Sequence, residues 1–179
     1  MRNFHNPQII FQTYHSLSRI RFFTFPTAIK ITLRNHHYIV EDGIAFPQKE
    51  TLDAQTGDAF FKSQSFTGIA IDVGSGKIVG LYILHPNNVG RCGHISNASY
   101  AVKKNKCGQH IGEFLVKDCL AKAKEIGFRI LQFNAVVATN TSALKLYKKL
   151  GFTQLGVIPK GFLLKDGNYE DIITHYIEL

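Results

Sequence analysis

The chain has 179 residues, of which 45% are hydrophobic and 19% charged, and it carries 21 Lys and Arg against 13 Asp and Glu. This composition excludes a disordered polypeptide, and no apolar run reaches the roughly 18 to 20 residues that a membrane-spanning helix needs. The formal charge of +8 favours an anionic partner, which could be nucleic acid, a lipid surface or a phosphorylated cofactor. Three lysines between residues 103 and 106 favour a local phosphate site over a nucleic-acid surface.

The N-terminal segment differs from the rest of the chain in charge. Residues 1–26 contain no Asp or Glu and carry several arginines and hydroxyl side chains. Such a composition is compatible with a mitochondrial transit peptide and with an N-terminal arm packed on the domain, and we favour the arm. We therefore expect an N-terminal arm over residues 1–26 and a single domain over residues 27–179.

The cysteine and histidine content indicates a protein without a metal. Three cysteines are odd in number and form no CxxC pair: Cys92, Cys107 and Cys119. This pattern predicts reduced thiols in a cytoplasmic compartment, with neither a zinc site nor a disulfide framework. His36 and His37 have no partner at metal-ligand spacing, so no metal is expected.

In the first half of the chain, short apolar runs bounded by turn residues predict strands at residues 27–34, 66–73, 77–84 and 93–102. Residues 35–50 contain Gly43 and Pro47 and predict an irregular connection. Residues 51–61 predict a short helix capped by Thr51. The Gly-Ser-Gly turn between the second and third strands predicts a β-hairpin.

In the second half, helical spacing of apolar residues begins at Ile111, and Gly127 supplies the C-terminal stop. Residues 128–137 are nearly all apolar, which predicts a strand buried on both faces. A second helix follows, with Thr139, Asn140 or Thr141 as its cap, and two final strands are expected at residues 152–162 and 169–179. The order of elements predicts an α/β (α+β) fold, with a mixed, mostly antiparallel sheet and helices on both faces.

The segment Cys-Gly-Gln-His-Ile-Gly, residues 107–112, stands between the lysines and the first long helix. A helix N-terminus offers free N–H groups and the positive end of the helix dipole, which suits a phosphate. Glycines also permit close approach of the backbone to a ligand. The segment alone is equally compatible with a helix cap that binds nothing.

The elements from residue 68 to 179 resemble, as an ordered set, the GCN5-related N-acetyltransferase (GNAT) family. That family has a strand, an (Arg/Gln)-x-x-Gly-x-(Gly/Ala) loop opening a long helix, and then Asn, Tyr and Gly-Phe. Here these are the loop 107–112, Asn140, Tyr147 and the pair 151–152. The resemblance implies the GNAT fold, whose splayed parallel strand pair binds acetyl-CoA, and it places the gap between the strand ending near Val102 and the next one.

The resemblance also implies which residues bind acetyl-CoA. The backbone of Tyr100 and Val102 would pair with the pantetheine arm, and the loop would hold the pyrophosphate. The full cofactor set that it implies is Tyr100, Val102, Cys107, Gly108, Gln109, His110, Ile111, Gly112 and Asn140. Cys107 and His110 depart from the family pattern, and His110 is tolerable if its backbone angles stay helical and its ring points outward.

The catalytic residues that the resemblance implies are Tyr147 and Asn140. Tyr147 would protonate the leaving thiolate, and Asn140 would hydrogen-bond the pantetheine or a water near it. Between Lys77 and Val102 there is no Asp or Glu, which argues against a strongly cationic acceptor.

The acceptor side offers Arg91, His94, Asn97 and Asn134 instead. Arginine and amide side chains suit an amine that carries its own carboxylate. His94 is also a candidate for taking a proton from the attacking amine. The pattern further resembles fungal acetyltransferases of proline analogues such as azetidine-2-carboxylate, which places Asn97 and Asn134 at the acceptor.

The expected activity is transfer of an acetyl group from acetyl-CoA to a small amine acceptor by direct attack. Three alternatives stay open: a non-catalytic CoA-binding protein in which Cys107 and His110 mark a decayed site, a protein or peptide N-acetyltransferase, and a basic nucleic-acid module. No membrane partner is expected, and exposed strand ends at the C-terminus permit a homodimer.

Overall fold

The structure is a computed structural model of the chain, and it describes residues 20–24 and 53–179. Seven strands form one sheet in the order β1-β2-β3-β4-β5-β7-β6. They are β1 (Ile20–Thr24), β2 (Phe66–Asp72), β3 (Lys77–Pro86), β4 (Ile95–Val102), β5 (Ile130–Val137), β6 (Thr153–Leu163) and β7 (Tyr169–Glu178). The helices are α2 (Ala54–Ser63), α3 (Ile111–Ile126) and α4 (Thr141–Lys149), with short 3-10 turns η1 (Gly90–Cys92) and η2 (Lys104–Lys106).

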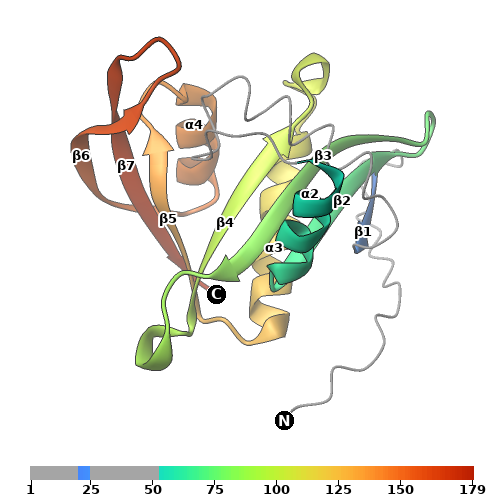
Figure 1. Ribbon diagram of the computed structural model, residues 1–179, viewed down its shortest axis with the longest axis horizontal. Coiled ribbons are helices and arrows are strands. Elements are labelled where there is room, and N and C mark those ends of the chain that lie inside the picture. Colours follow the sequence, from blue (N-terminus) through green and yellow to red (C-terminus); the bar gives the residue numbers. More distant parts are fainter. Residues whose placement is uncertain (1–19, 25–52) are drawn as a thin grey trace.

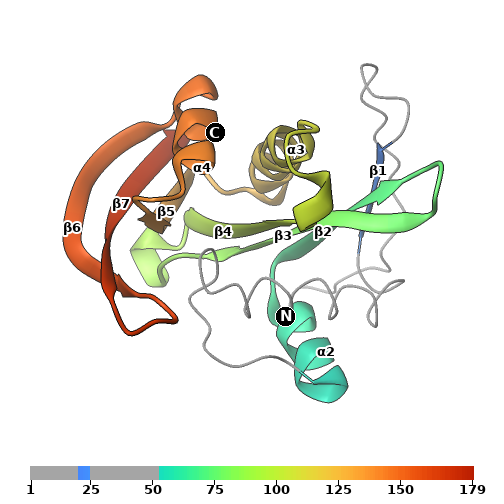
Figure 2. The ribbon, with the colours of Figure 1, turned by 90° about the horizontal axis from the view of Figure 1, so that it is seen from above.

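The layers follow the predicted fold class. Helices α3 and α4 lie on one side of the sheet and α2 lies on the other (Figure 2). All described strand pairs are antiparallel except β4 with β5. The mixed, mostly antiparallel sheet with helices on both faces is therefore confirmed. None of the helices in the two described ranges has the length and apolar character needed to cross a bilayer.

The N-terminal part of the described chain adds an edge strand to the sheet and corrects the expected cap of the first helix. Residues 20–24 of the predicted arm form β1, which pairs with β2 and makes one edge of the sheet. Helix α2 is capped by Asp53 rather than Thr51, because the Asp53 carboxylate accepts a hydrogen bond from the backbone N–H of Thr56 at 2.8 Å. The predicted strand 27–34, the connection 35–50 and Thr51 lie outside the described residues.

Helix α3 forms where its apolar spacing predicts. Its buried side chains include Ile111, Leu115, Cys119 and Ala123, which recur every four residues and face the sheet. Gly127 has a φ of 104°, a left-handed conformation that ends the helix. Beneath the helix, the Tyr82 hydroxyl of β3 donates a hydrogen bond of 2.6 Å to the buried carboxylate of Asp118.

Strands β4 and β5 separate soon after they begin to pair. The parallel ladder joins only Ile95 with Ile130 and Ser96 with Leu131. Beyond these pairs the two strands diverge, and the open end of the V lies toward the top of Figure 1. β5 also has a bulge between Phe133 and Val136, opposite β7. The expectation that β5 is buried on both faces throughout is wrong, since the two residues within the bulge are exposed.

Candidate active site

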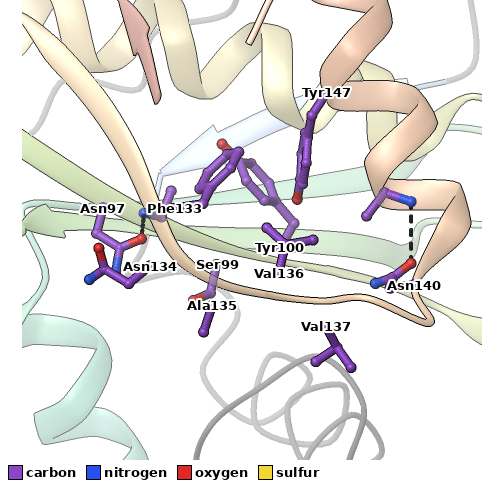
Figure 3. Close-up of a pocket in the computed structure, with 12 residues that line it drawn as sticks. Asn97, Ser99, Tyr100, Phe133, Asn134, Ala135, Val136, Val137, Asn140 and Tyr147 are labelled. Atoms are coloured by element: carbon purple, nitrogen blue, oxygen red, sulfur yellow. Dashed lines mark hydrogen bonds between the residues drawn. The ribbon is translucent and has the colours of Figure 1, made fainter. Parts of the chain in front are cut away.

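The gap between β4 and β5 holds a cavity with a volume of about 290 Å³. It is lined by Asn97, Ala98, Ser99, Tyr100, Phe133, Asn134, Ala135, Val136, Val137, Asn140, Ala143 and Tyr147. Figure 3 shows Asn97 and Asn134 at one end of this cavity and Asn140 at the other. Residues that are as much as 50 positions apart in the chain therefore meet where the sequence motifs indicated a site.

The free edge of β4 is fixed by its ladder with β3. Lys103 N–H donates to the Val79 carbonyl, and Asn87 N–H donates to the Ile95 carbonyl. Since alternate residues of an antiparallel strand bond to the same neighbour, the odd-numbered residues of β4 are bonded to β3. The N–H and C=O groups of Ala98, Tyr100 and Val102 consequently point toward β5, which has already diverged. An extended pantetheine arm can add to this edge as a strand would.

The loop before α3 forms a concave set of backbone donors. Within the described chain, the N–H groups of residues 109–113 have no hydrogen-bond acceptor, and the first helical bond runs from Phe114 N–H to the His110 carbonyl. Gly108 has a φ of 79° and His110 a φ of 59°. Successive backbone N–H groups in a turn that includes left-handed residues form a nest, a concavity that holds anions. These residues fit a pyrophosphate.

The expectation for His110 is half wrong. Its backbone is left-handed (φ 59°, ψ 8°) rather than helical, because the chain must reverse direction to enter α3 at Ile111. Its side chain is 71% exposed and so points outward as expected. A histidine thus takes a conformation that glycine adopts without strain, and the nest keeps its shape.

Charged side chains surround the nest. Lys103 and Lys104 come from the segment before the loop, and the Lys106 ammonium lies 3.5 Å from the Asp72 carboxylate. In the first turn of α3, Glu113 accepts hydrogen bonds from Lys117 at 2.8 Å and from Lys149 of α4 at 2.6 Å. These two lysines lower the pKa of Glu113 to about 2. The carboxylate is therefore ionised and ties the start of α3 to the end of α4.

Tyr147 reaches the cavity from α4. Its ring is 8% exposed and packs against Phe133 with centroids 4.5 Å apart, and its hydroxyl points from the helix toward the strands (Figure 3). Burial raises the pKa of Tyr147, and the nearby buried thiol of Cys119 adds to this. The phenol is therefore protonated at neutral pH, as a proton donor must be.

Asn140 serves two purposes at once. Its side-chain oxygen accepts a hydrogen bond of 3.2 Å from the Ala143 N–H, which caps α4 as predicted. The same side chain lines the cavity. Because the cap uses only the oxygen, the amide N–H groups remain available to a ligand.

Amide side chains gather at the other end of the cavity. The Asn134 oxygen accepts hydrogen bonds from Asn87 at 3.2 Å and from Gln132 at 2.9 Å, while the Asn134 nitrogen donates to Asn87 at 2.6 Å. The Asn97 oxygen accepts from the Ala98 N–H at 2.8 Å. Asn87 and Gln132 were not expected here. Asn87 follows β3 in a Pro-Asn pair, but only the sheet order reveals that it reaches β5 across β4.

Arg91 and His94 do not line the cavity. His94 accepts a hydrogen bond from the Arg129 N–H through its backbone, immediately before the pairs that close the V. Arg91 lies in η1, three residues earlier, and both side chains are exposed. The loop thus carries them to the closed end of the V. Among residues 20–24 and 53–179, no three His, Cys, Asp or Glu side chains gather as a metal site would require.

Comparison with known proteins agrees with this geometry. Residues 32–152 match the acetyltransferase (GNAT) family. The N-acetyltransferase aca1 of Schizosaccharomyces pombe is 31% identical over 156 residues, which cover 79% of this chain and 74% of that protein.

Two solved structures share the fold. A GCN5-related N-acetyltransferase from Kribbella flavida matches with a TM-score of 0.81 and 28% identity, over 90% of this chain and 98% of that one. A phosphinothricin acetyltransferase from Sinorhizobium meliloti, solved with acetyl-CoA, matches with a TM-score of 0.82 and 16% identity, over 90% and 89% of the two chains. The chain belongs to the acetyltransferase (GNAT) family and is an acetyl-CoA-dependent N-acetyltransferase.

Proposed function

We propose that the acceptor is a small amine that carries its own carboxylate, such as an amino acid or a proline analogue. The observation behind this proposal is which side-chain amide atoms at the acceptor end of the cavity already form hydrogen bonds within the protein. The side-chain oxygens of Asn97 and Asn134 are both engaged by protein donors. No hydrogen bond within the described residues uses the Asn97 nitrogen, and the Asn134 nitrogen makes only one of its two. Both residues therefore offer N–H donors to a ligand.

The charge of the cavity supports the same acceptor. Its lining contains no Asp or Glu among the described residues. A polyamine or lysine tail would bring a positive charge with nothing opposite to pair with it, which is costly in a partly enclosed site. A carboxylate instead accepts charge-assisted hydrogen bonds from amide N–H groups.

The residues divide the work of the reaction between them. Acetyl-CoA supplies the activated acetyl thioester. The N–H groups before α3 and the free edge of β4 hold and orient it, and the asparagines place the acceptor. Tyr147, buried and protonated, gives its proton to the departing sulfur.

A matched pair of acceptors tests the proposal. Thiol release from acetyl-CoA is measured with azetidine-2-carboxylate and with its carboxamide, which has the same ring and amine but no negative charge. We expect kcat/KM to be at least about tenfold higher for the carboxylate, because hydrogen bonds to a charged group contribute roughly 1.5 to 3 kcal/mol. At a given pH, more of the carboxamide is present as the free amine that can attack the thioester. This difference favours the carboxamide, so it cannot produce the expected preference for the carboxylate.

Three outcomes would contradict the proposal. Equal or faster turnover of the carboxamide would mean that no carboxylate is recognised. Turnover confined to peptides with a free N-terminus would favour the protein N-acetyltransferase alternative. Binding of acetyl-CoA without thiol release for any amine would favour the non-catalytic alternative.

A further inference from the structure

We infer that His85 accepts the proton that the acceptor amine must lose before it attacks the thioester, through one bridging water. The inference rests on the proposed transfer to a small amine and adds the base for that reaction. An amine is protonated at neutral pH and is not a nucleophile until it loses this proton, so an adjacent base is required.

The sheet register places His85 beside the acceptor end of the cavity. His85 of β3 lies directly opposite Asn97 of β4, which lines the cavity. Directly opposite residues of antiparallel strands project on the same face, with Cβ atoms roughly 4.5 to 5.5 Å apart. Tyr82, at the other parity of β3, points to Asp118 of α3. His85 and Asn97 therefore lie on the opposite face of the sheet, the side of α2.

The hydrogen bond of the ring fixes its tautomer. His85 Nδ1 lies 3.0 Å from the backbone carbonyl oxygen of Pro86. A carbonyl oxygen only accepts hydrogen bonds, so Nδ1 carries a proton, and in the neutral form of this tautomer the lone pair is on Nε2. No hydrogen bond of the described residues uses Nε2. An imidazole whose Nε2 is free beside Asn97 is suited to accept a proton.

The other titratable groups near the cavity do not fill this role. The titratable side chains of the lining are Tyr100 and Tyr147, which are protonated acids. His175 is buried and, as the partner of Phe133 in the β5–β7 ladder, projects on the face of the sheet that carries Tyr147, opposite to the face of His85; its ring centroid lies 6.0 Å from that of Tyr147.

The elements around His85 present few charges. β4 presents Asn97, and β5 presents the uncharged amide side chains of Gln132 and Asn134. Asp58 and Lys62 of α2 pair with each other at 2.7 Å. On the loop that follows β3, the charged and titratable groups are Arg91, Cys92 and His94.

Each proton in the reaction has a donor and an acceptor. A secondary ammonium gives one proton to His85 through the water, and His85 passes it to solvent. The nitrogen lone pair then forms the bond to the acetyl carbon as the carbon–sulfur bond breaks. Its electron pair goes to sulfur, which takes the proton of Tyr147. The remaining N–H proton, lost as the amide forms, replaces the one that Tyr147 gave.

Two substitutions separate a base from a structural histidine. His85→Asn keeps an N–H where Nδ1 stands and can still donate to Pro86, whereas His85→Gln keeps a polar group near Nε2. Neither variant has a basic nitrogen. With acetyl-CoA saturating and azetidine-2-carboxylate varied, we expect the acceptor kcat/KM at pH 7 to fall about 100-fold in both.

Three further readouts complete the test. Added imidazole should restore part of the turnover of His85→Ala, and the acetyl-CoA Kd and unfolding temperature of all variants should match the wild type. If His85→Asn or His85→Gln keeps full turnover, the inference is overturned while the proposed function stands. If the wild-type protein acetylates neither azetidine-2-carboxylate nor any other small amine that is tested, the proposed function fails and the inference fails with it.

Discussion

The cofactor end and the acceptor end of the cavity are built from different parts of the chain. At the cofactor end, the groups that face the ligand are backbone N–H and C=O groups, on the free edge of β4 and before α3. At the acceptor end, they are side-chain amides held by other side chains, as in the pairing of Asn87 with Asn134.

This difference decides how much each region tolerates substitution. A backbone site depends on φ and ψ, so Cys107 and His110 can replace the usual residues while the nest keeps its shape. A side-chain site changes with every residue and with the partners that orient it. The acceptor end is therefore where relatives with one fold come to differ in substrate.

The largest expected effect comes from Tyr147, which stands between the two ends. Tyr147→Phe keeps the ring contact with Phe133 and removes only the hydroxyl. We expect kcat to fall about 100-fold or more, because the sulfur loses its proton donor, with the acetyl-CoA Kd unchanged. Steady-state thiol release and calorimetry measure the two quantities. Tyr169→Phe, at a 60% exposed position, is the matched control, and equal losses in both variants would contradict the assignment.

The second-largest expected effect tests how the acceptor end of the cavity recognises its substrate. Asn134→Asp is nearly isosteric but replaces the N–H donors by a negative charge, which should repel a carboxylate. We expect the acceptor KM to rise about 10- to 100-fold, as the loss of a hydrogen bond to a charged group predicts, with the acetyl-CoA KM unchanged. Asn87→Ala removes both hydrogen bonds between Asn87 and Asn134 but leaves the one from Gln132, so it should give a smaller rise. An Asn134→Asp variant with an unchanged acceptor KM would remove this residue from the acceptor site.

The same contrast explains what the sequence could predict. Periodicity and glycine stops located β2 to β7, α3 and α4, because their signals are local. The motif also located the backbone nest, since a loop at a helix start carries its own geometry. Asn87 and His85 were missed because their place depends on the strand order and register. Arg91 and His94 were expected at the cavity because sequence cannot show which end of the V a loop faces.

The third prediction concerns how substitutions at the left-handed positions of the backbone nest change the stability of the protein. His110→Gly should raise the free energy of unfolding by about 0.5 to 1 kcal/mol, since a left-handed residue with a Cβ costs roughly 1 to 2 kcal/mol and the flexibility of glycine offsets part of the gain. Gly108→Ala should lower it by about 1 kcal/mol, because its φ is 79° and no atom within 4 Å would clash with the new Cβ. Urea unfolding measures both.

Acetyl-CoA affinity separates the backbone from the ring of His110. The Kd of His110→Gly should change by less than about threefold, because the backbone N–H groups that bind the pyrophosphate remain. A tenfold weaker Kd would show that the imidazole itself is a phosphate ligand. The cofactor end would then depend on side chains as the acceptor end does.

The smallest effect concerns Glu113, the one carboxylate in the first turn of α3. Glu113→Gln breaks the ion pairs with Lys117 and Lys149, both of which are substantially exposed, so we expect a loss of only about 0.5 kcal/mol at pH 7. The folded-state pKa is depressed from 4.5 to about 2. The stabilisation is therefore complete above about pH 4.5 and is lost as the pH falls toward 2, so the two proteins should converge in urea unfolding at low pH.

Acetyl-CoA binding should respond to the same substitution in the opposite direction. Glu113 places a negative charge beside the nest that holds the pyrophosphate, and its removal frees two lysines to face the phosphates. We expect acetyl-CoA to bind about twofold more tightly to Glu113→Gln at low salt, with the gain lost at high ionic strength. Weaker binding at low salt would mean that Glu113 shapes the nest rather than merely opposing its charge, because a change in backbone geometry would outweigh the relief of repulsion.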